Sequence, residues 1–391
     1  MRRAAICAVV VWCCVGSAAY ADGPGVGAPS IAALGDSAIS GEAGRWAGNT
    51  NGSSSRVDAL GSTAYWDTPT GEAIRGCHRS KSAEVYIGIQ AVNLACSGAR
   101  TTTSAGGSDF KPGIDFYSDS SGRVGQARAL QQYASSHNVK AVVLLIGANN
   151  YGFADIVQAC VTDWLTSPSW WPNYCQDDSG IRARFTNARI TAETANVRTA
   201  ILNVHTAMAN AGYGDDQWTL LVQTYSSPIP NGAGFRYPQT GFTRQTIGGC
   251  GVWNRDADWA NRTVVTTFNS TAVNAAAQSG LSNVEILDMT NALAGHRLCE
   301  NTVGLLEEKG VATWQTPGAV DKSEWVSQIR TVTTLFPPYQ LQEDGHPSYW
   351  GQLALRNCLR LAYNDGATRA GTCTPAGGGL NGSGEPMMTL R

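Results

Sequence analysis

The stretch of sequence that decides the fold is Ala33-Leu34-Gly35-Asp36-Ser37-Ala38-Ile39-Ser40-Gly41-Glu42. The run 30–34 predicts a short apolar strand, the next two residues predict a turn, and a helix is expected to begin at Ser37. A strand-to-helix turn presents a side chain at the open end of a parallel sheet, close to free backbone N–H groups. A nucleophilic serine needs that geometry. Gly-Asp-Ser is also common in turns, so the triplet alone is equally typical of a helix N-cap.

Three further motifs follow in order along the chain. They are Asn93-Leu94-Ala95-Cys96-Ser97-Gly98-Ala99, Val142-Val143-Leu144-Leu145-Ile146-Gly147-Ala148-Asn149-Asn150 and Glu343-Asp344-Gly345-His346-Pro347-Ser348. With the first stretch they resemble the four blocks of the SGNH (GDSL) hydrolase superfamily, across roughly residues 30–365. The marker residues of that family fall on Ser37, Gly98, Asn149 and His346.

This resemblance implies a role for each marker residue. Ser37 would be the nucleophile, and His346 would take its proton, for which a near-neutral pKa is suited. The backbone N–H groups of Ser37 and Gly98 and the side-chain amide of Asn149 would form an oxyanion hole. Taken singly, Gly98 is equally typical of a turn and Asn149 of a loop residue that caps the next helix. His296 is the only serious rival for the base.

The acidic partner of the histidine departs from the family pattern. The family usually places Asp three residues before the histidine, where this chain has Glu343, and Asp344 is one residue too late. Glu343 is the favoured partner, because its longer side chain could still reach the imidazole. Asp344 with a shifted backbone is an alternative. A main-chain carbonyl that orients the ring, leaving a Ser–His dyad, is the third.

The start of the chain predicts export. Residues 1–21 combine two arginines, an apolar core and an Ala19-Tyr20-Ala21 cleavage signal, so we expect a signal peptide and a secreted protein. The rest has no second apolar stretch of membrane-spanning length, and its net charge of −2 gives no reason to expect nucleic acid as a partner. We expect a monomer.

Eight cysteines follow the signal segment, an even number that suggests disulfides in an exported protein. Eight cysteines allow 105 pairings. Sequential pairing closes the shortest loops, and three-disulfide relatives in the family look sequentially paired. We therefore expect the pairs Cys77–Cys96, Cys160–Cys175, Cys250–Cys299 and Cys358–Cys373. The chain has no C-x-x-C motif and its histidines are scattered, so we expect neither a metal nor a cofactor.

Apolar, β-rich runs alternate with helical patterns along the chain. The predicted strands are 30–34, 91–95, 140–146, 219–224 and 283–288, and the predicted helices are 127–137, 189–210, 256–277 and 348–362. This alternation predicts an α/β, flavodoxin-like three-layer sandwich with a parallel, roughly five-stranded sheet and long disulfide-stapled insertions. The predicted insertions are 41–76, 152–181, 226–254 and 301–340. We expect one domain over 22–373 and a flexible, glycine-rich tail over 374–391.

Two functional classes remain after these patterns. The first is a secreted serine hydrolase that cleaves carboxylic esters of lipids or acetylated glycans. The second is a secreted binding protein that kept the fold with little or no turnover. The aromatic residues between Cys160 and Cys175 are interpreted either as a wall of the substrate site or as the small core of their own insertion; they are Trp164, Trp170, Trp171 and Tyr174.

Overall fold

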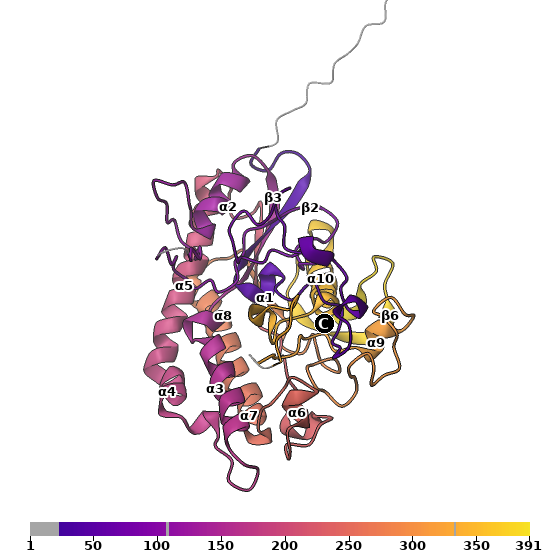
Figure 1. Ribbon diagram of the computed structural model, residues 1–391. Coiled ribbons are helices and arrows are strands. Elements are labelled where there is room, and N and C mark those ends of the chain that lie inside the picture. The colour runs from indigo at the N-terminus through magenta and orange to yellow at the C-terminus, as the bar shows by residue number, and fades with distance from the viewer. Residues whose placement is uncertain (1–22, 107–108, 332–333) are drawn as a thin grey trace, which may run out of the picture.

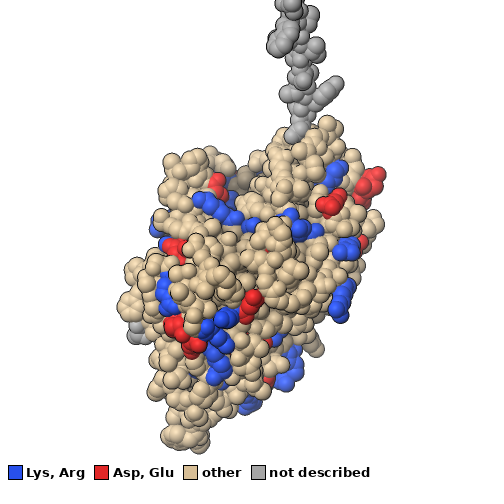
Figure 2. Space-filling view, turned by 90° about the vertical axis from the view of Figure 1, so that its right-hand side faces the viewer, with Lys and Arg blue, Asp and Glu red and all other residues tan. Residues whose placement is uncertain are grey.

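A computed structural model describes residues 23–106, 109–331 and 334–391. The expected signal peptide, residues 1–21, lies outside the described residues. Lys and Arg are scattered among Asp and Glu on the face shown in Figure 2, as the near-balance of 28 basic and 30 acidic residues leads one to expect. In the part of the chain that is described, no helix is both long and apolar enough to cross a membrane.

A seven-stranded sheet runs through the molecule. Its strands are β1 (Pro29–Gly35), β2 (Gln90–Asn93), β3 (Asn138–Leu145), β4 (Thr219–Gln223), β5 (Val284–Asp288), β6 (Gly371–Leu380) and β7 (Pro386–Leu390). They lie in the order β2-β1-β3-β4-β5-β6-β7, and only the pairing of β6 with β7 is antiparallel. The first five strands therefore have the flavodoxin-like order. The prediction of a parallel α/β sheet is confirmed, with two strands more than the five expected.

The additional strands escaped the sequence analysis because β6 is a poor strand by composition. It contains Pro375 and the three glycines of 377–379, residue types that are depleted in strands. β6 pairs with β5 through only two residue pairs, at Gly371 and Thr372. The pairing with β7 and the packing against the last helix decide the conformation of this segment.

Helices follow the strands. The α-helices are α1 (Ser37–Ser40), α2 (Gln126–Ala134), α3 (Phe153–Thr166), α4 (Ser179–Arg182), α5 (Asn187–Asn210), α6 (Thr243–Thr246), α7 (Asn254–Trp259), α8 (Thr266–Ser279), α9 (Ala319–Lys322) and α10 (Tyr349–Tyr363). A π-helical turn, η7 (Ala260–Val265), joins α7 to α8. The short 3-10 helices are η1 (Ser54–Arg56), η2 (Gly61–Thr63), η3 (Ala148–Asn150), η4 (Cys175–Asp177), η5 (Ala183–Phe185), η6 (Gly232–Gly234), η8 (Leu341–Glu343) and η9 (Asn364–Gly366).

Helices cover both faces of the sheet, which produces three layers (Figure 1). Successive side chains of a strand point to opposite faces. Leu34 and Leu144 pack with α2, α5 and α8, whereas Ala33 and Val143 belong to the core that includes α1 and α10. The chain leaves β3 into α3 and leaves β4 into α6 and α7. These helices thus lie beyond the carboxyl ends of the strands, on the side of α1 (Figure 1).

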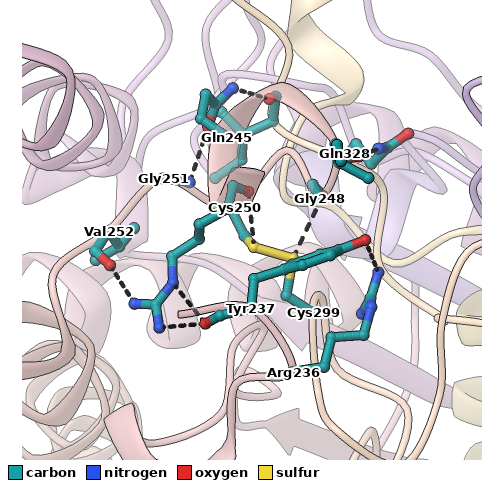
Figure 3. The surroundings of a disulfide bond; sticks show 12 residues. Arg236, Tyr237, Gln245, Gly248, Cys250, Gly251, Val252, Cys299 and Gln328 are labelled. Atoms are coloured by element: carbon teal, nitrogen blue, oxygen red, sulfur yellow. Dashed lines mark hydrogen bonds between the residues drawn. A yellow bond between two sulfur atoms is a disulfide. The ribbon is translucent and has the colours of Figure 1, made fainter. Parts of the chain in front are cut away.

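Four disulfides cross-link the described residues. They join Cys77 to Cys96, Cys160 to Cys175, Cys250 to Cys299 and Cys358 to Cys373, the same pairs that the sequence analysis expects. Figure 3 shows the third, with Tyr237 and Val252 nearby. The buried guanidinium of Arg244 donates to the carbonyls of these two residues. The predicted insertion 152–181 is partly regular, because it contains the 14-residue helix α3.

The expected flexible tail, 374–391, is instead the β6–β7 hairpin, so that prediction was wrong. Its glycines suggested mobility, but tertiary contacts fix it. Glu385, which is 1% exposed, accepts hydrogen bonds from Nε of Arg360 at 3.1 Å and from Nδ2 of Asn357 at 3.2 Å, both on α10. Cys373, at the start of the same segment, is bonded to Cys358 on α10. The hairpin is therefore part of the domain.

We expect Glu385→Ala to destabilise the protein. The change removes an acceptor shared by Arg360 and Asn357, and hydrogen bonds to charged groups contribute about 1.5–3 kcal/mol each. The measurement is the urea midpoint of unfolding with disulfides intact. Met387→Ala, on β7 two residues after Glu385, is the control, because this side chain is 38% exposed and its loss should cost less than about 0.5 kcal/mol. Equal effects of the two changes would contradict a docked hairpin.

Candidate active site

Ser37 is the first residue of α1, immediately beyond the end of β1. The turn depends on Gly35, whose φ is 146° and at which an added Cβ would lie 2.0 Å from the carbonyl oxygen of Leu145. Only glycine allows that approach. Asp36 caps the helix, since its Oδ1 accepts from the backbone N–H of Ala38 at 3.2 Å. Ser37 is thereby held at the carboxyl edge of the sheet.

His346 meets the serine from the other end of the sequence. Its Nε2 lies 2.7 Å from Oγ of Ser37, across 309 residues of sequence separation. Its Nδ1 lies 3.0 Å from the carbonyl oxygen of Asp344. A carbonyl can only accept, so Nδ1 carries the proton and Nε2 is left to accept from the serine hydroxyl. This tautomer is the one required of a base that takes the proton of Ser37.

The carboxylate of Glu343, the favoured acid, does not bond to the imidazole of His346, so that prediction was wrong. Its Oε1 accepts from the hydroxyl of Tyr65 at 2.7 Å, and its Oε2 accepts from the backbone N–H of Gln340 at 2.9 Å. The second bond is half of a capping box around η8, and it turns the carboxylate back toward the start of that helix. Both oxygens of Glu343 are therefore bonded to groups other than the imidazole.

Asp344 reaches the histidine through its backbone and not through its side chain. Oδ2 of Asp344 accepts from the backbone N–H of Arg330 at 2.8 Å. Burial raises the pKa of this carboxyl to about 8. Of the three arrangements that the sequence leaves open, the one present is a main-chain carbonyl behind the ring.

Burial sets the protonation of His346. It lowers the pKa of the imidazole below its ordinary value, against the charge of Glu42 and the bond to the Asp344 carbonyl, which act in the opposite direction. The neutral ring therefore persists to lower pH than in an exposed histidine. The expected rival, His296, lies elsewhere: its ring stacks on Trp325 with centroids 3.7 Å apart, and its Nδ1 lies 3.0 Å from the carbonyl of Ser323.

Of the expected oxyanion donors, Asn149 lines the same pocket as Ser37, and its side chain bonds to Ala99, next to Gly98. The backbone N–H groups of Ser37 and Gly98 have no hydrogen-bond partner among the described residues. Gly98 has a φ of 77°, and Asn149 donates one amide hydrogen to the carbonyl of Ala99 at 3.0 Å, which leaves the other free. Asn150 anchors this loop instead, because its Nδ2 donates to Thr101 at 2.8 Å and to Glu193 at 2.7 Å.

An apolar pocket of about 130 Å³ opens beside Ser37, Asn149 and His346. Its walls come mainly from α3, the α7–η7 segment, α8 and the insertion after β4; among them are Phe153, Ile156, Val157, Ile229, Val252, Val264 and Phe268. Glu84 is one of few ionisable groups in the lining, and burial raises its pKa to about 8. An acyl chain, which has no polar groups to satisfy, fits such a wall.

A second cavity, of about 590 Å³, is polar and lies toward the Gly98 loop. Trp66, Glu72, Arg75 and Lys111 are among its lining residues. Lys111 marks how close it comes to the oxyanion residues, because a Cβ added to Gly98 would lie 3.7 Å from its Cε. Polar parts of a substrate would be solvated here and not in the apolar pocket.

The four aromatic residues between Cys160 and Cys175 do not line the apolar pocket. Trp164 is buried and packs edge-to-face on Phe242, with centroids 6.1 Å apart, and against Trp253 at 6.0 Å. Trp170 and Trp171 are 81% and 74% exposed. Trp164 therefore packs against the neighbouring insertion, 226–254, and none of these three tryptophans lines the apolar pocket.

A buried cluster beside the site was missed by sequence reasoning. Glu42 contacts His78 and Ser97 through its two carboxylate oxygens. The available signal was position alone, since Glu42 lies within the first motif and Ser97 directly precedes Gly98. Across the described ranges, no group of three His, Cys, Asp or Glu side chains is arranged to hold a metal ion.

Two solved structures have a fold similar to that of this chain. No protein-family description and no curated protein matches the chain. The fold is similar to that of an extracellular lipase from Streptomyces rimosus, at 19% identity and a TM-score of 0.42, over 87% of this chain and 100% of that one. It is also similar to a phospholipase A1 from Streptomyces albidoflavus, at 18% identity and a TM-score of 0.44, with the same coverage of both chains.

The buried imidazole predicts the pH dependence of Ser37 reactivity. Labelling of Ser37 by a fluorophosphonate needs neutral His346, whose pKa is lowered by burial. The labelling rate should therefore stay constant as pH falls through neutrality and decline only with an apparent pKa below about 6.5, the ordinary histidine value. The rate is measured by quenching the labelling reaction at successive times and quantifying the labelled fraction by mass spectrometry. An apparent pKa above 7 would contradict the assigned environment.

The same assay distinguishes the carbonyl from the two carboxylates. Glu343→Gln and Asp344→Asn should each change the labelling rate by less than about tenfold, which is roughly 1.4 kcal/mol of barrier. The reason is that neither side chain contacts the ring. His346→Ala, in contrast, should reduce the rate by orders of magnitude. A loss of a thousandfold or more in Glu343→Gln would restore Glu343 as the acid.

Proposed function

We propose that this chain is a secreted SGNH-type serine hydrolase that cleaves carboxylic esters. The observation that carries the proposal is the 2.7 Å contact between Oγ of Ser37 and Nε2 of His346, with Nδ1 bonded to a carbonyl. The hydroxyl of Ser37, the ring of His346 and the carbonyl of Asp344 form a continuous chain of hydrogen bonds, the arrangement of nucleophile, base and orienting group that nucleophilic catalysis uses. The four ordered sequence motifs support the same conclusion.

The reaction begins when Oγ of Ser37 attacks the ester carbonyl carbon and its proton passes to Nε2 of His346. The carbonyl oxygen becomes an oxyanion, which the N–H groups of Ser37 and Gly98 and the amide of Asn149 stabilise. His346 then gives its proton to the departing alcohol oxygen, and the C–O bond breaks to leave an acyl-serine. Water attacks this ester with His346 again as base, releasing the acid and restoring Ser37.

A carbonyl in place of an acid changes one part of this scheme. The carbonyl of Asp344 fixes the tautomer and orientation of His346, as a carboxylate would. It carries a partial charge only, so it stabilises the imidazolium less than a full negative charge. The site therefore acts as a Ser–His dyad that is oriented by the main chain.

The lining of the pocket favours a lipid ester over an acetylated glycan. The space beside Ser37 is walled by apolar side chains such as Phe153, Ile156 and Val264. Each buried CH₂ of an acyl chain contributes about 0.8 kcal/mol there, whereas a sugar would leave its hydroxyl groups unpaired. The polar cavity near Gly98 is suited to the alcohol part. Four disulfides agree with a secreted protein, and we propose a monomer.

Turnover of soluble p-nitrophenyl esters tests the proposed chemistry. Ser37→Ala should lower kcat by orders of magnitude and leave the melting temperature nearly unchanged. Asn149→Ala should cost roughly 10²–10³ in kcat, the usual effect of removing one oxyanion donor. If Ser37→Ala retained the activity of the natural chain, the mechanism would be wrong. If the natural chain bound such esters without hydrolysing them, it would be a binding protein.

Filling the pocket tests the lipid preference. Ile156 lines the pocket and is 4% exposed, so Ile156→Trp should reduce kcat/KM at least tenfold for decanoate or longer esters and spare the acetate ester. Leu165→Trp is the matched control, because Leu165 is on the same helix but 37% exposed and outside the lining. Equal loss for short and long esters, at an unchanged melting temperature, would contradict an acyl pocket.

A further inference from the structure

Glu42 is a fully buried carboxylate that the proposed mechanism does not use. It follows the short helix α1, and its backbone N–H donates to the carbonyl of Ser37 at 3.1 Å. Gly41, the residue between α1 and Glu42, has a φ of 95°, and this turn lets the chain fold back onto the first residue of α1. A buried charge is costly unless it is paired and hydrogen-bonded, so the contacts of this side chain need an explanation.

Both oxygens of the Glu42 carboxylate are engaged. Oε1 pairs with Nδ1 of His78, and Oε2 accepts from the hydroxyl of Ser97. The side chains of His78 and Ser97 are buried with it. Ser97 directly precedes Gly98, whose backbone N–H has no partner among the described residues. One carboxylate thus joins the turn that carries the nucleophile to the loop that carries an oxyanion donor.

A disulfide reinforces the same junction. Cys77 precedes His78, Cys96 precedes Ser97, and the two cysteines are bonded. The backbone N–H of Ser97 also donates to the carbonyl of Cys77 at 3.1 Å. The two segments that contact Glu42 are therefore fixed to each other, and the carboxylate fixes both to α1.

The electrostatics of the cluster favour a charged pair. Burial opposes protonation of His78, but the hydrogen bond and charge of Glu42, with Glu72, outweigh it and raise the pKa of the imidazole. Nε2 of His78 lies 3.7 Å from Glu72, which lines the polar cavity. The Glu42 charge also favours the protonated form of His346. Glu42 thus acts on His346 through its charge alone, since the hydrogen-bond partner of Nδ1 is a carbonyl and not a carboxylate.

We infer that Glu42 is a positioning residue for ester hydrolysis, which sets the backbone N–H of Gly98, through Ser97, relative to the Ser37 turn. This inference rests on the proposed hydrolase function. An oxyanion donor stabilises the transition state only when it already points to the place where charge develops. A displacement of one ångström in such a group can cost about a hundredfold in rate. The ground state, whose carbonyl is uncharged, depends far less on the same donor.

Glu42→Gln is the test, because glutamine keeps the shape but cannot accept from both His78 and Ser97 with the geometry of a carboxylate. We expect kcat for a p-nitrophenyl ester to fall ten- to a hundredfold while KM changes less than threefold. The Ki of a trifluoromethyl ketone, which forms an oxyanion on Ser37, should rise in parallel with the loss of kcat/KM. Ser97→Ala should show the same split.

A double variant sharpens the test, because residues that act through one contact are not additive. The double variant Glu42→Gln with Ser97→Ala should therefore have a kcat within about threefold of that of the slower single variant. Glu343→Gln is the matched control. That carboxylate is equally buried and also bonded, to Tyr65 and Gln340, but it does not contact the Gly98 loop. The Glu343→Gln variant should have a lower melting temperature but should not show the ten- to hundredfold fall in kcat expected of Glu42→Gln.

The outcomes separate the two levels of inference. If the natural chain shows no ester turnover, the proposed function fails and with it the inference. If the natural chain turns over but Glu42→Gln and Ser97→Ala keep kcat and Ki, the inference alone is overturned. It is also overturned if Glu343→Gln loses as much kcat as Glu42→Gln at equal folded fraction. Ser97→Ala decides the question if Glu42→Gln does not fold.

Discussion

The close approach of Gly35 to the end of β3 is the constraint on which the site depends. The backbone N–H of Asp36 donates to the carbonyl of Leu145 at 3.1 Å, which stops β1 at the edge of the sheet. The side chain of Gln126 completes the backbone bonds of Gly35, donating to its carbonyl at 2.9 Å and accepting from its N–H at 2.8 Å. With the backbone bonds of Gly35 satisfied at that point, the chain turns and places Ser37 in the lining of the apolar pocket.

The rest of the site is arranged around that fixed serine by segments distant in sequence. His346 comes from the loop before α10, and the Gly98 loop comes after β2. Each is tied down by the main chain or by buried polar groups: the carbonyl of Asp344 for the histidine, and Glu42 for the loop. The protein thus obtains orientation from hydrogen bonds that are shielded from water, where they are stronger than at the surface.

The surroundings of Ser37 are the basis of the proposed preference for lipid esters. One cavity is apolar enough that burial raises the pKa of Glu84, in its lining, to about 8. The other, lined by Glu72, Arg75 and Lys111, is polar. The proposed substrate, with an alkyl chain on one side of its carbonyl and a polar alcohol on the other, has one part suited to each of these two environments.

The sequence by itself determined the parallel sheet, because buried strands such as Val142–Leu145 must be apolar on both faces, and it located Ser37 and His346 through motifs confined to a few residues. It did not determine the partner of His346, because the capping box of η8 takes the carboxylate of Glu343, and such competition for one oxygen is decided in space. The β6–β7 hairpin and the Glu42 cluster likewise depend on contacts between distant segments, Glu385 with α10 and Glu42 with Ser97. Local propensity carries no information about such contacts, so only the tertiary structure decided them.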